Sequence, residues 1–181
     1  MRDIEIRGAA RDVMKSRAPE VLVSGSAGTG KTTTALLKLH ITLATVPKTE
    51  ALLLRQTLAS LSATTLIGWE RSIIDGSLAD AKVVWHGGSA RQAPSYTYPN
   101  GSRLFVGGLD NPGRVLSAQY CRILVDEVNQ VSITGWETLL TRLRGSYGTY
   151  KQIVGCCNPQ SQSHWVKERA DLGTMHHIVS D

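Results

Sequence analysis

The segment from Gly25 to Thr32 constrains this chain more than any other part of its sequence. It reads GSAGTGKT and matches every fixed position of the phosphate-loop pattern, in which a glycine and four residues of any type precede Gly-Lys and Ser or Thr. The β-branched, apolar run Val21 to Ser24 precedes it, and Thr32 to Ala44 reads as a helix. A helix N-terminus presents backbone N–H groups and the positive end of a dipole to an anion. The segment therefore predicts a strand–loop–helix unit that binds a nucleoside triphosphate.

The residue types in this loop match the chemistry of phosphate binding. Glycines let consecutive backbone N–H groups wrap the β-phosphate, Lys31 reaches the β- and γ-phosphates, and the Thr32 hydroxyl ligates Mg²⁺. ATP and Mg²⁺ are the expected cofactors. The residues expected to contact the nucleotide are Gly25, Ser26, Ala27, Gly28, Thr29, Gly30, Lys31, Thr32 and Thr33.

Composition argues against a disordered, membrane-spanning or secreted protein. The chain has 181 residues, 41% hydrophobic and 19% charged, which suits one globular domain and argues against disorder. No apolar run approaches the roughly 20 residues that cross a bilayer, and the N-terminus lacks the apolar core of a signal peptide, so we expect a cytoplasmic protein with no membrane partner. Cys121, Cys156 and Cys157 predict reduced core thiols, and the five histidines form no ligand pattern. The net charge of +5 permits a polyanionic partner.

Strand-like and helical patterns alternate along most of the chain, as in a parallel α/β fold. The exception is the middle, where Asn100-Gly101 joins two β-rich runs and predicts a hairpin. We therefore expect a phosphate-loop NTPase fold, a mainly parallel sheet sandwiched by helices with an antiparallel meander at one edge. The expected strands are near 21–24, 51–54, 82–85, 96–98, 103–106, 122–125, 153–157 and 175–179, and the expected helices near 4–17, 32–44, 58–74, 132–144 and 164–170.

A second nucleotide element follows at Ile123 to Glu127, an apolar strand that ends in two acidic residues. In a parallel sheet its carboxyl end faces the same edge as the phosphate loop. Asp126 is therefore positioned to hold Mg²⁺. Glu127 is expected to be the general base that orients the attacking water, which separates a hydrolase from a nucleotide binder.

Two further polar residues follow strands at this edge. Asn158 comes after the strand Ile153 to Cys157, where it can sense the γ-phosphate or its water, although a turn asparagine before Pro159 is an equal alternative. Arg55 follows the second strand and could touch nucleotide or nucleic acid, or be a simple surface arginine.

The phosphate loop contains no arginine, although phosphoryl transfer often uses one. An arginine acting in trans from a neighbouring subunit is the natural inference. Arg114, in a turn-rich segment, is the first candidate, and Arg142 and Arg144 are the others. For this last pair the alternative is a favourable interaction with the C-terminal end of a helix.

These pieces resemble the ATPase domain of the large terminase subunit, the DNA-packaging motor of tailed double-stranded DNA bacteriophages. The likeness covers most of the chain, and the order and spacing of its motifs are more specific than either nucleotide element alone. It rests on residues 19–32, on 54–61 (LRQTLASL), on 98–102 and 106–110, on 125–127, on 136–144 and on 155–159 (GCCNP).

The resemblance implies ATP-driven translocation of double-stranded DNA into a procapsid inside an infected bacterium. It implies that Glu127 is the catalytic glutamate and that Asn158 couples hydrolysis to movement. The implied partners are DNA, the portal ring, the small terminase subunit and further copies in a ring, a pentamer in the family. Many members carry an arginine inside the phosphate loop, and its absence here favours a trans arginine. The family's lid subdomain and RNase H-like nuclease are not expected within residues 1–181, so we expect a motor core without nuclease activity.

Two other readings remain. A helicase-like ATPase would share the edge-of-sheet layout, but the second domain of such enzymes is not found in the sequence, and a small-molecule kinase is more distant. A nucleotide-gated assembly module would bind ATP without turnover, which Glu127 and Asn158 argue against.

Overall fold

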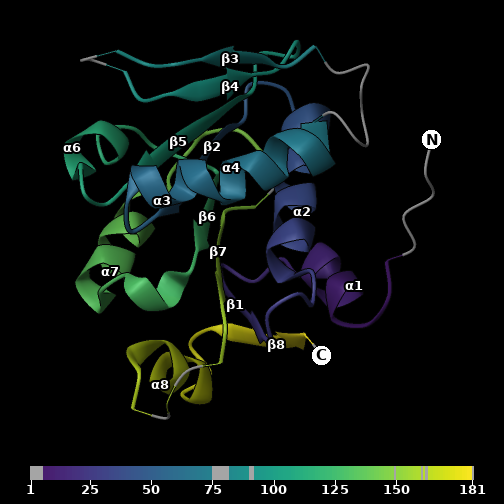
Figure 1. Ribbon diagram of the computed structural model, residues 1–181, viewed down its shortest axis with the longest axis vertical. Helices are drawn as coiled ribbons and strands as arrows, with labels where there is room; N and C mark the ends of the chain where they lie inside the picture. Colours follow the sequence, from purple (N-terminus) through teal and green to yellow (C-terminus); the bar gives the residue numbers. More distant parts are fainter. Residues whose placement is uncertain are drawn as a thin grey trace.

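The computed structural model describes residues 6–74, 82–89, 92–148, 150–159, 161 and 163–180. Its centre is a sheet with the strand order β3-β4-β5-β2-β6-β7-β1-β8, which Figure 1 shows from β3 at the top to β8 at the bottom. The strands are β1 (Glu20–Gly25), β2 (Glu50–Arg55), β3 (Val84–His86), β4 (Ser95–Thr97), β5 (Arg103–Gly108), β6 (Arg122–Asp126), β7 (Gln152–Cys157) and β8 (His176–Ser180).

Six of these strands, β1, β2, β5, β6, β7 and β8, pair in parallel, whereas β3 and β4 form an antiparallel meander on β5. The central strands are continuous apolar runs because both faces of the sheet are covered. Ala51 to Leu54 of β2, for example, are all fully buried. The predicted fold class, including the hairpin that brings β4 beside β5, is confirmed.

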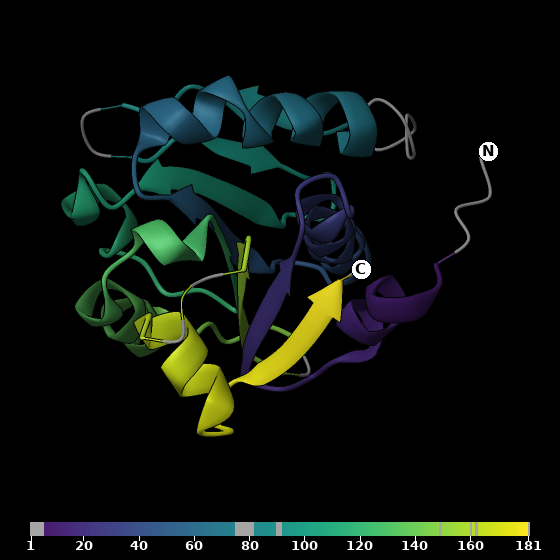
Figure 2. The same ribbon diagram turned by 60° about the horizontal axis from the view of Figure 1, so that its bottom comes forward.

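Helices cover the two faces of the sheet, as Figures 1 and 2 show. One core cluster joins the sheet to α1, α2, α3, α4 and η1. The other joins it to α6, α7 and α8. The helices are α1 (Gly8–Lys15), α2 (Lys31–Thr45), α3 (Leu58–Ala63), α4 (Thr65–Gly68), η1 (Trp69–Ile74), α6 (Pro112–Val115), η2 (Val128–Gln130), α7 (Ile133–Arg142) and α8 (Trp165–Asp171).

The predicted helix over 58–74 is wrong in one respect, because it is broken at Thr64. There the backbone leaves the helical region, with φ −133° and ψ −73°, and η1 continues as a π-helix after α4. The Thr64 hydroxyl donates to Ser60 O at 2.8 Å, and Thr65 turns its hydroxyl toward β6. The bond from Thr64 to the carbonyl four residues back, followed by a second β-branched residue whose side chain binds β6, weakens helix continuity here.

Smaller differences lie at the ends of elements. The first helix begins at Gly8, and residues 4–5 of its predicted span lie outside the described residues. The segment around Arg114 forms the short helix α6, and α7 ends at Arg142, two residues earlier than predicted. All three cysteines are free and buried, as predicted. Within the described ranges, no helix is long and apolar enough to cross a membrane.

Candidate nucleotide-binding site

A cleft of about 400 Å³ opens at the carboxyl ends of the central parallel strands. Register explains why these ends converge: Leu54 of β2 pairs with Val125 of β6, and Asp126 pairs with Cys156 of β7. Carboxyl ends of parallel strands are where open α/β sheets bind ligands. The cleft is lined by Ala27, Gly28, Lys31, Thr32, Thr33, Leu36, Arg55, Thr64, Thr65, Gly68, Asp126, Glu127, Cys156, Cys157 and Asn158.

The phosphate loop connects β1 to α2 at one side of this cleft. Gly28 and Gly30 have φ of +84° and +78°, a conformation that residues with a side chain rarely adopt. Gly25 is required for a different reason, since a Cβ there would lie 2.1 Å from Ser180 O of β8. The two glycines of the pattern, Gly25 and Gly30, and Gly28 between them therefore set the conformation of the loop and its close packing against β8.

Lys31 and Asn158 lie together inside the cleft. The Lys31 ammonium donates to Ser26 O at 2.6 Å and to Asn158 Oδ1 at 3.3 Å, and the side chain is largely buried. The structure thus brings Asn158, which follows β7, to Lys31 of the phosphate loop, at the edge of the sheet where the sequence predicted it. Its role as a sensor stays a prediction.

Thr32 and Asp126 form the pair predicted to hold Mg²⁺. The Thr32 hydroxyl donates to Asp126 Oδ1 at 2.9 Å, and Asp126 is buried. A hydroxyl and a carboxylate oxygen are hard ligands of the kind Mg²⁺ prefers, and this ion is usually held by one or two carboxylates with phosphates and waters. Within the described residues no group of three or more His, Cys, Asp or Glu side chains could hold a metal. The oxygen pair therefore fits Mg²⁺ bound together with a nucleotide.

Glu127 directly follows β6 and has a left-handed backbone, with φ 50° and ψ 51°. Such a conformation in a residue with a side chain is costly and concentrates at functional sites. Its carboxylate forms an ion pair with Arg55 Nη2 and accepts a hydrogen bond from Gln130. The turn redirects Glu127 from the line of the strand into the cleft.

Arg55 is buried, so its alternative as a simple surface arginine is wrong. Its side chain is 9% exposed and lies between the two acids, with Nε 3.7 Å from Asp126 Oδ2. Nη1 donates to Thr64 Oγ1 at 2.8 Å and to Ser60 O at 3.2 Å. Arg55 thus links both carboxylates to the break between α3 and α4.

Sequence reasoning missed two residues of this site. The Thr65 hydroxyl donates to Asp126 Oδ2 at 2.5 Å, across a separation of 61 residues, and Gln130 donates to Glu127. Neither belongs to a recognised motif. The only signal in the sequence was weak: Thr64 and Thr65 are adjacent β-branched residues in the middle of an otherwise helical pattern.

The three candidate arginine fingers lie away from the cleft. Arg114 is exposed on α6, Arg142 ends α7, and Arg144 is exposed after it. The structure of one chain therefore brings none of them to the phosphate loop.

The two cysteines of the cleft are unsuited to nucleophilic chemistry. Burial raises the pKa of the Cys156 thiol far above its ordinary value, and burial raises the pKa of Cys157 to about 11 against a smaller opposing effect of Lys31. Both are therefore neutral thiols at pH 7, and a thiolate is the reactive form.

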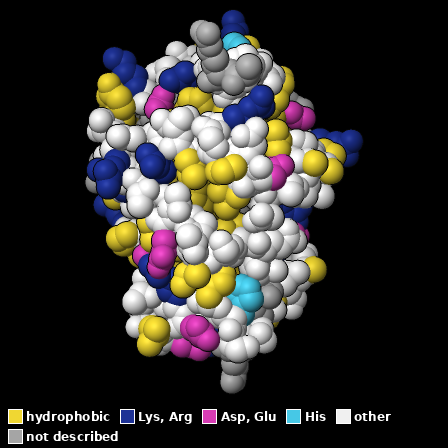
Figure 3. All heavy atoms as spheres, turned by 90° about the vertical axis from the view of Figure 1, so that its left-hand side faces the viewer, with side chains coloured by type: hydrophobic (Ala, Val, Ile, Leu, Met, Phe, Trp, Pro, Cys, Tyr) yellow, Lys and Arg dark blue, Asp and Glu magenta, His cyan; other side chains and the backbone are white. Residues whose placement is uncertain are grey.

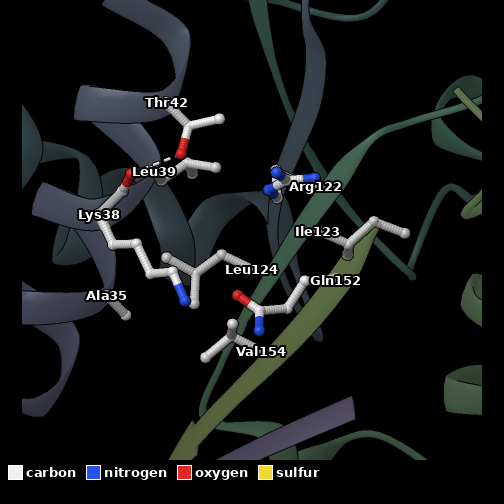
Figure 4. Close-up of a pocket in the computed structure, with 9 residues that line it drawn as sticks. All are labelled: Ala35, Lys38, Leu39, Thr42, Arg122, Ile123, Leu124, Gln152 and Val154. Atoms are coloured by element: carbon white, nitrogen blue, oxygen red, sulfur yellow. Dashed lines mark hydrogen bonds between the residues drawn. The ribbon is translucent and has the colours of Figure 1, made fainter. Parts of the chain in front are cut away.

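A second, much smaller cavity of about 20 Å³ lies at the opposite end of the sheet. Figure 4 shows Lys38 of α2 beside Gln152 at the start of β7, with Arg122 at the start of β6. Lys38 Nζ donates to Val13 O at 2.9 Å and to Ser16 O at 2.5 Å. Burial, with Arg122 and Arg17 nearby, lowers the pKa of Lys38 to about 8.

The sheet order, the glycine loop after β1 and the acidic pair at the end of β6 define a phosphate-loop NTPase fold. The model of the phage terminase large subunit family matches residues 18–171, and the chain belongs to this family. Comparison with curated protein sequences gave no match.

Solved large terminases share the fold at low sequence identity. The large terminase of a thermophilic bacteriophage superposes with a TM-score of 0.76 at 14% identity, over 97% of this chain and 46% of its own. The ATPase domain of the Thermus phage P74-26 large terminase superposes with a TM-score of 0.59 at 12% identity, over 94% of this chain and 86% of its own. The large terminase of bacteriophage HK97 superposes with a TM-score of 0.64 at 12% identity, over 94% of this chain and 36% of its own. The chain thus spans less than half the length of the thermophilic phage protein, whose structures include complexes with ADP and ATP-gamma-S.

Proposed function

We propose that this chain binds ATP with Mg²⁺ and hydrolyses it, and that this hydrolysis drives double-stranded DNA into a viral procapsid. The observation that carries the proposal is the convergence of Lys31, Thr32, Asp126 and Glu127 on one cleft at the carboxyl edge of the sheet. Membership of the terminase large subunit family supports the motor function. The nucleotide complexes of the thermophilic phage large terminase support the choice of ligand.

The residues of the cleft divide the chemistry among them. Lys31 and the loop N–H groups hold the β- and γ-phosphates, and Thr32 and Asp126 hold Mg²⁺, which supplies charge for the leaving phosphate oxygens. Glu127 accepts the proton of the attacking water. Asn158, which is hydrogen-bonded to Lys31, is proposed to respond when the γ-phosphate leaves.

Phosphate release tests turnover, with Lys31→Ala as the matched variant. The wild-type chain is expected to release phosphate from MgATP, and Lys31→Ala is expected to lose nucleotide binding. Binding of ATP without any phosphate release by assembled wild-type protein would favour the nucleotide-gated assembly module. Unwinding of duplex DNA would favour the helicase-like alternative.

DNA is proposed to bind through its backbone, without sequence preference, because a packaging motor moves any sequence. The net charge of +5 is modest, so the chain alone should bind weakly. Affinity is expected to fall steeply as salt rises, since each phosphate contact releases counterions. A strong preference for one duplex sequence at constant salt would contradict this. The portal ring and the small terminase subunit complete the proposed set of partners.

Hydrolysis is proposed to need a neighbouring copy in a ring. Arg114, Arg142 and Arg144 do not line their own cleft, and Arg55, which does, is held by Asp126 and Glu127. Figure 3 shows the side of the molecule that carries α6 and α7, where hydrophobic side chains gather in the middle and Lys and Arg lie around them. Arg114 of α6 is exposed, and Ile133, which begins α7, is 43% exposed. Such a surface suits contact between subunits.

A mixing experiment tests the trans arginine. Arg114→Ala keeps an intact cleft, and Glu127→Gln keeps an intact Arg114, so a mixture of the two inactive proteins should recover part of the activity. Arginine fingers typically contribute about 10³ to 10⁵ in rate. No recovery in a mixture shown to co-assemble would assign the role to an arginine in cis, or to Arg142 or Arg144.

A further inference from the structure

We propose that Thr65 is a positioning residue for Asp126: its hydroxyl holds one carboxylate oxygen so that the other faces Thr32 and Mg²⁺. The inference rests on the proposed function, in which Thr32 and Asp126 hold the ion. Thr65 belongs to none of the sequence motifs, and it reaches the site from a helix that the motifs do not include.

The two oxygens of Asp126 have different partners. Oδ1 accepts from Thr32 at 2.9 Å and Oδ2 accepts from Thr65 at 2.5 Å. Both side chains at the second contact are buried, with Thr65 6% and Asp126 7% exposed. A short hydrogen bond to a buried carboxylate is strong, because little water competes for the oxygen. The carboxylate is therefore held in one orientation by two hydroxyls, one on each oxygen.

The break between α3 and α4 puts Thr65 where Asp126 needs a donor. A helix continuous through Thr64 would not have the backbone turn that the φ of −133° and ψ of −73° produce there. Leu66 and Trp69, directly beyond, are buried in the core. Thr65 is consequently carried on a short segment that packing holds against the sheet.

Without the Thr65 hydroxyl, Arg55 remains near Oδ2, with its Nε 3.7 Å away. The charge of Arg55 would then attract the carboxylate away from Thr32. Residues that orient a metal ligand through such hydrogen bonds typically change metal affinity about 10-fold to 100-fold when mutated. Thr65 should therefore affect the Mg²⁺ dependence of nucleotide binding and leave Mg²⁺-independent binding unchanged.

The test is a Mg²⁺ titration of binding of a fluorescent ATP analogue, without any need for turnover. Thr65→Val keeps the shape and removes the hydroxyl, and it should raise the Mg²⁺ concentration for half-maximal binding about 10-fold. Thr65→Ser restores the donor and should behave as the wild type. Thr42→Val is the matched control, since the Thr42 hydroxyl donates only to Lys38 O within α2. Binding measured in EDTA should be the same for all four proteins.

The outcomes separate the two proposals. A wild-type chain whose nucleotide binding ignores Mg²⁺ would overturn the proposed Mg²⁺ site itself. A Mg²⁺-dependent wild type with an unchanged, folded Thr65→Val would overturn only the role of Thr65, and so would a Thr65→Ser protein as impaired as Thr65→Val. If Thr65→Val does not fold, Thr65→Ala is titrated instead, and wild-type Mg²⁺ dependence in that folded variant would also overturn the role.

Discussion

The two ends of the sheet use buried charge in opposite ways. At the carboxyl end, the Arg55 guanidinium pairs with the carboxylates of Asp126 and Glu127. At the amino end, Lys38 donates to the backbone carbonyls of Val13 and Ser16. The first set surrounds a cleft of about 400 Å³, and the second borders a cavity of about 20 Å³.

Because of this difference, the residues of the cleft can exchange their hydrogen-bond partners for a ligand, whereas Lys38 at the amino end cannot. Side-chain pairs can turn toward a ligand that enters the cleft, because each side chain has its own torsional freedom. Backbone carbonyls are fixed by the fold, so a cation such as Lys38, whose hydrogen bonds go to carbonyls, serves stability, whereas Lys31 and Arg55 also bind side chains of the cleft. Arg122 follows the second pattern, donating to Cys121 O at 2.9 Å and to Tyr150 O, with its guanidinium 3.7 Å from the centre of the Tyr150 ring.

The largest effect is expected at the carboxyl end, from Glu127→Gln. Loss of the general base should lower turnover by about 10² to 10⁴ while MgATP binding is kept. Steady-state phosphate release and nucleotide titration measure the two quantities. Turnover at the wild-type rate would remove Glu127 from the role of general base and weaken the contrast between the two ends.

Arg55→Met tests the ion pairs of the same end. Removing the cation leaves Asp126 and Glu127 near each other without compensation, and we expect a loss of about 1 to 3 kcal/mol in the free energy of unfolding, reduced by the 38% exposure of Glu127. Mg²⁺ with nucleotide should restore part of it, since the ion supplies the missing positive charge. Urea unfolding with and without MgATP measures both, and a variant as stable as the wild type would show that the pairs contribute little.

At the amino end, Lys38→Met should affect stability and not chemistry. Methionine keeps the volume of the side chain but leaves Val13 O without its side-chain donor, whereas Ser16 O keeps the hydrogen bond from Gln152 Nε2 at 3.2 Å. An unsatisfied buried acceptor costs about 1 to 3 kcal/mol, and removal of a buried charge offsets part of this. Nucleotide affinity should equal that of the wild type. A loss of affinity in a folded Lys38→Met protein would contradict the separation of the two ends.

The smallest expected effect is a pH dependence of the contribution that Lys38 makes to the free energy of unfolding. The folded pKa of Lys38 is about 8, below its ordinary value of 10.5, so the unfolded chain binds more protons between these values. The cost of burying the charge is present in full below pH 8 and fades as pH rises toward 10.5. Stability of the wild type relative to Lys38→Met should therefore increase with pH, by about 1 kcal/mol between pH 8 and pH 9. A difference that stays constant or falls would contradict the lowered pKa.

Local patterns in the sequence were sufficient to predict the sheet and the motif residues. The two motifs, Gly25 to Thr32 and Asp126-Glu127, were predicted to lie together, because the carboxyl ends of strands in a parallel sheet meet at one edge. The antiparallel meander followed from Asn100-Gly101, which permits the tight turn.

The interactions among these residues could not be predicted in the same way. Arg55 was placed at the correct edge, but its burial between two carboxylates depends on β2 lying beside β6, which is a property of the strand order. Thr65 is still harder to predict, since its contact depends on a break in a helix that local propensity favours as continuous. Both residues act through partners that are distant in sequence.

The contact between Gly25 and Ser180 has a mechanical consequence. No side chain separates the start of the phosphate loop from the end of β8, and the Ser180 hydroxyl donates to Thr29 O within the loop at 3.2 Å. A force along β8 would therefore reach the phosphate-binding backbone directly, without passing through the hydrophobic core. Because this approach and this hydrogen bond join β8 to the loop, a displacement of one is expected to move the other.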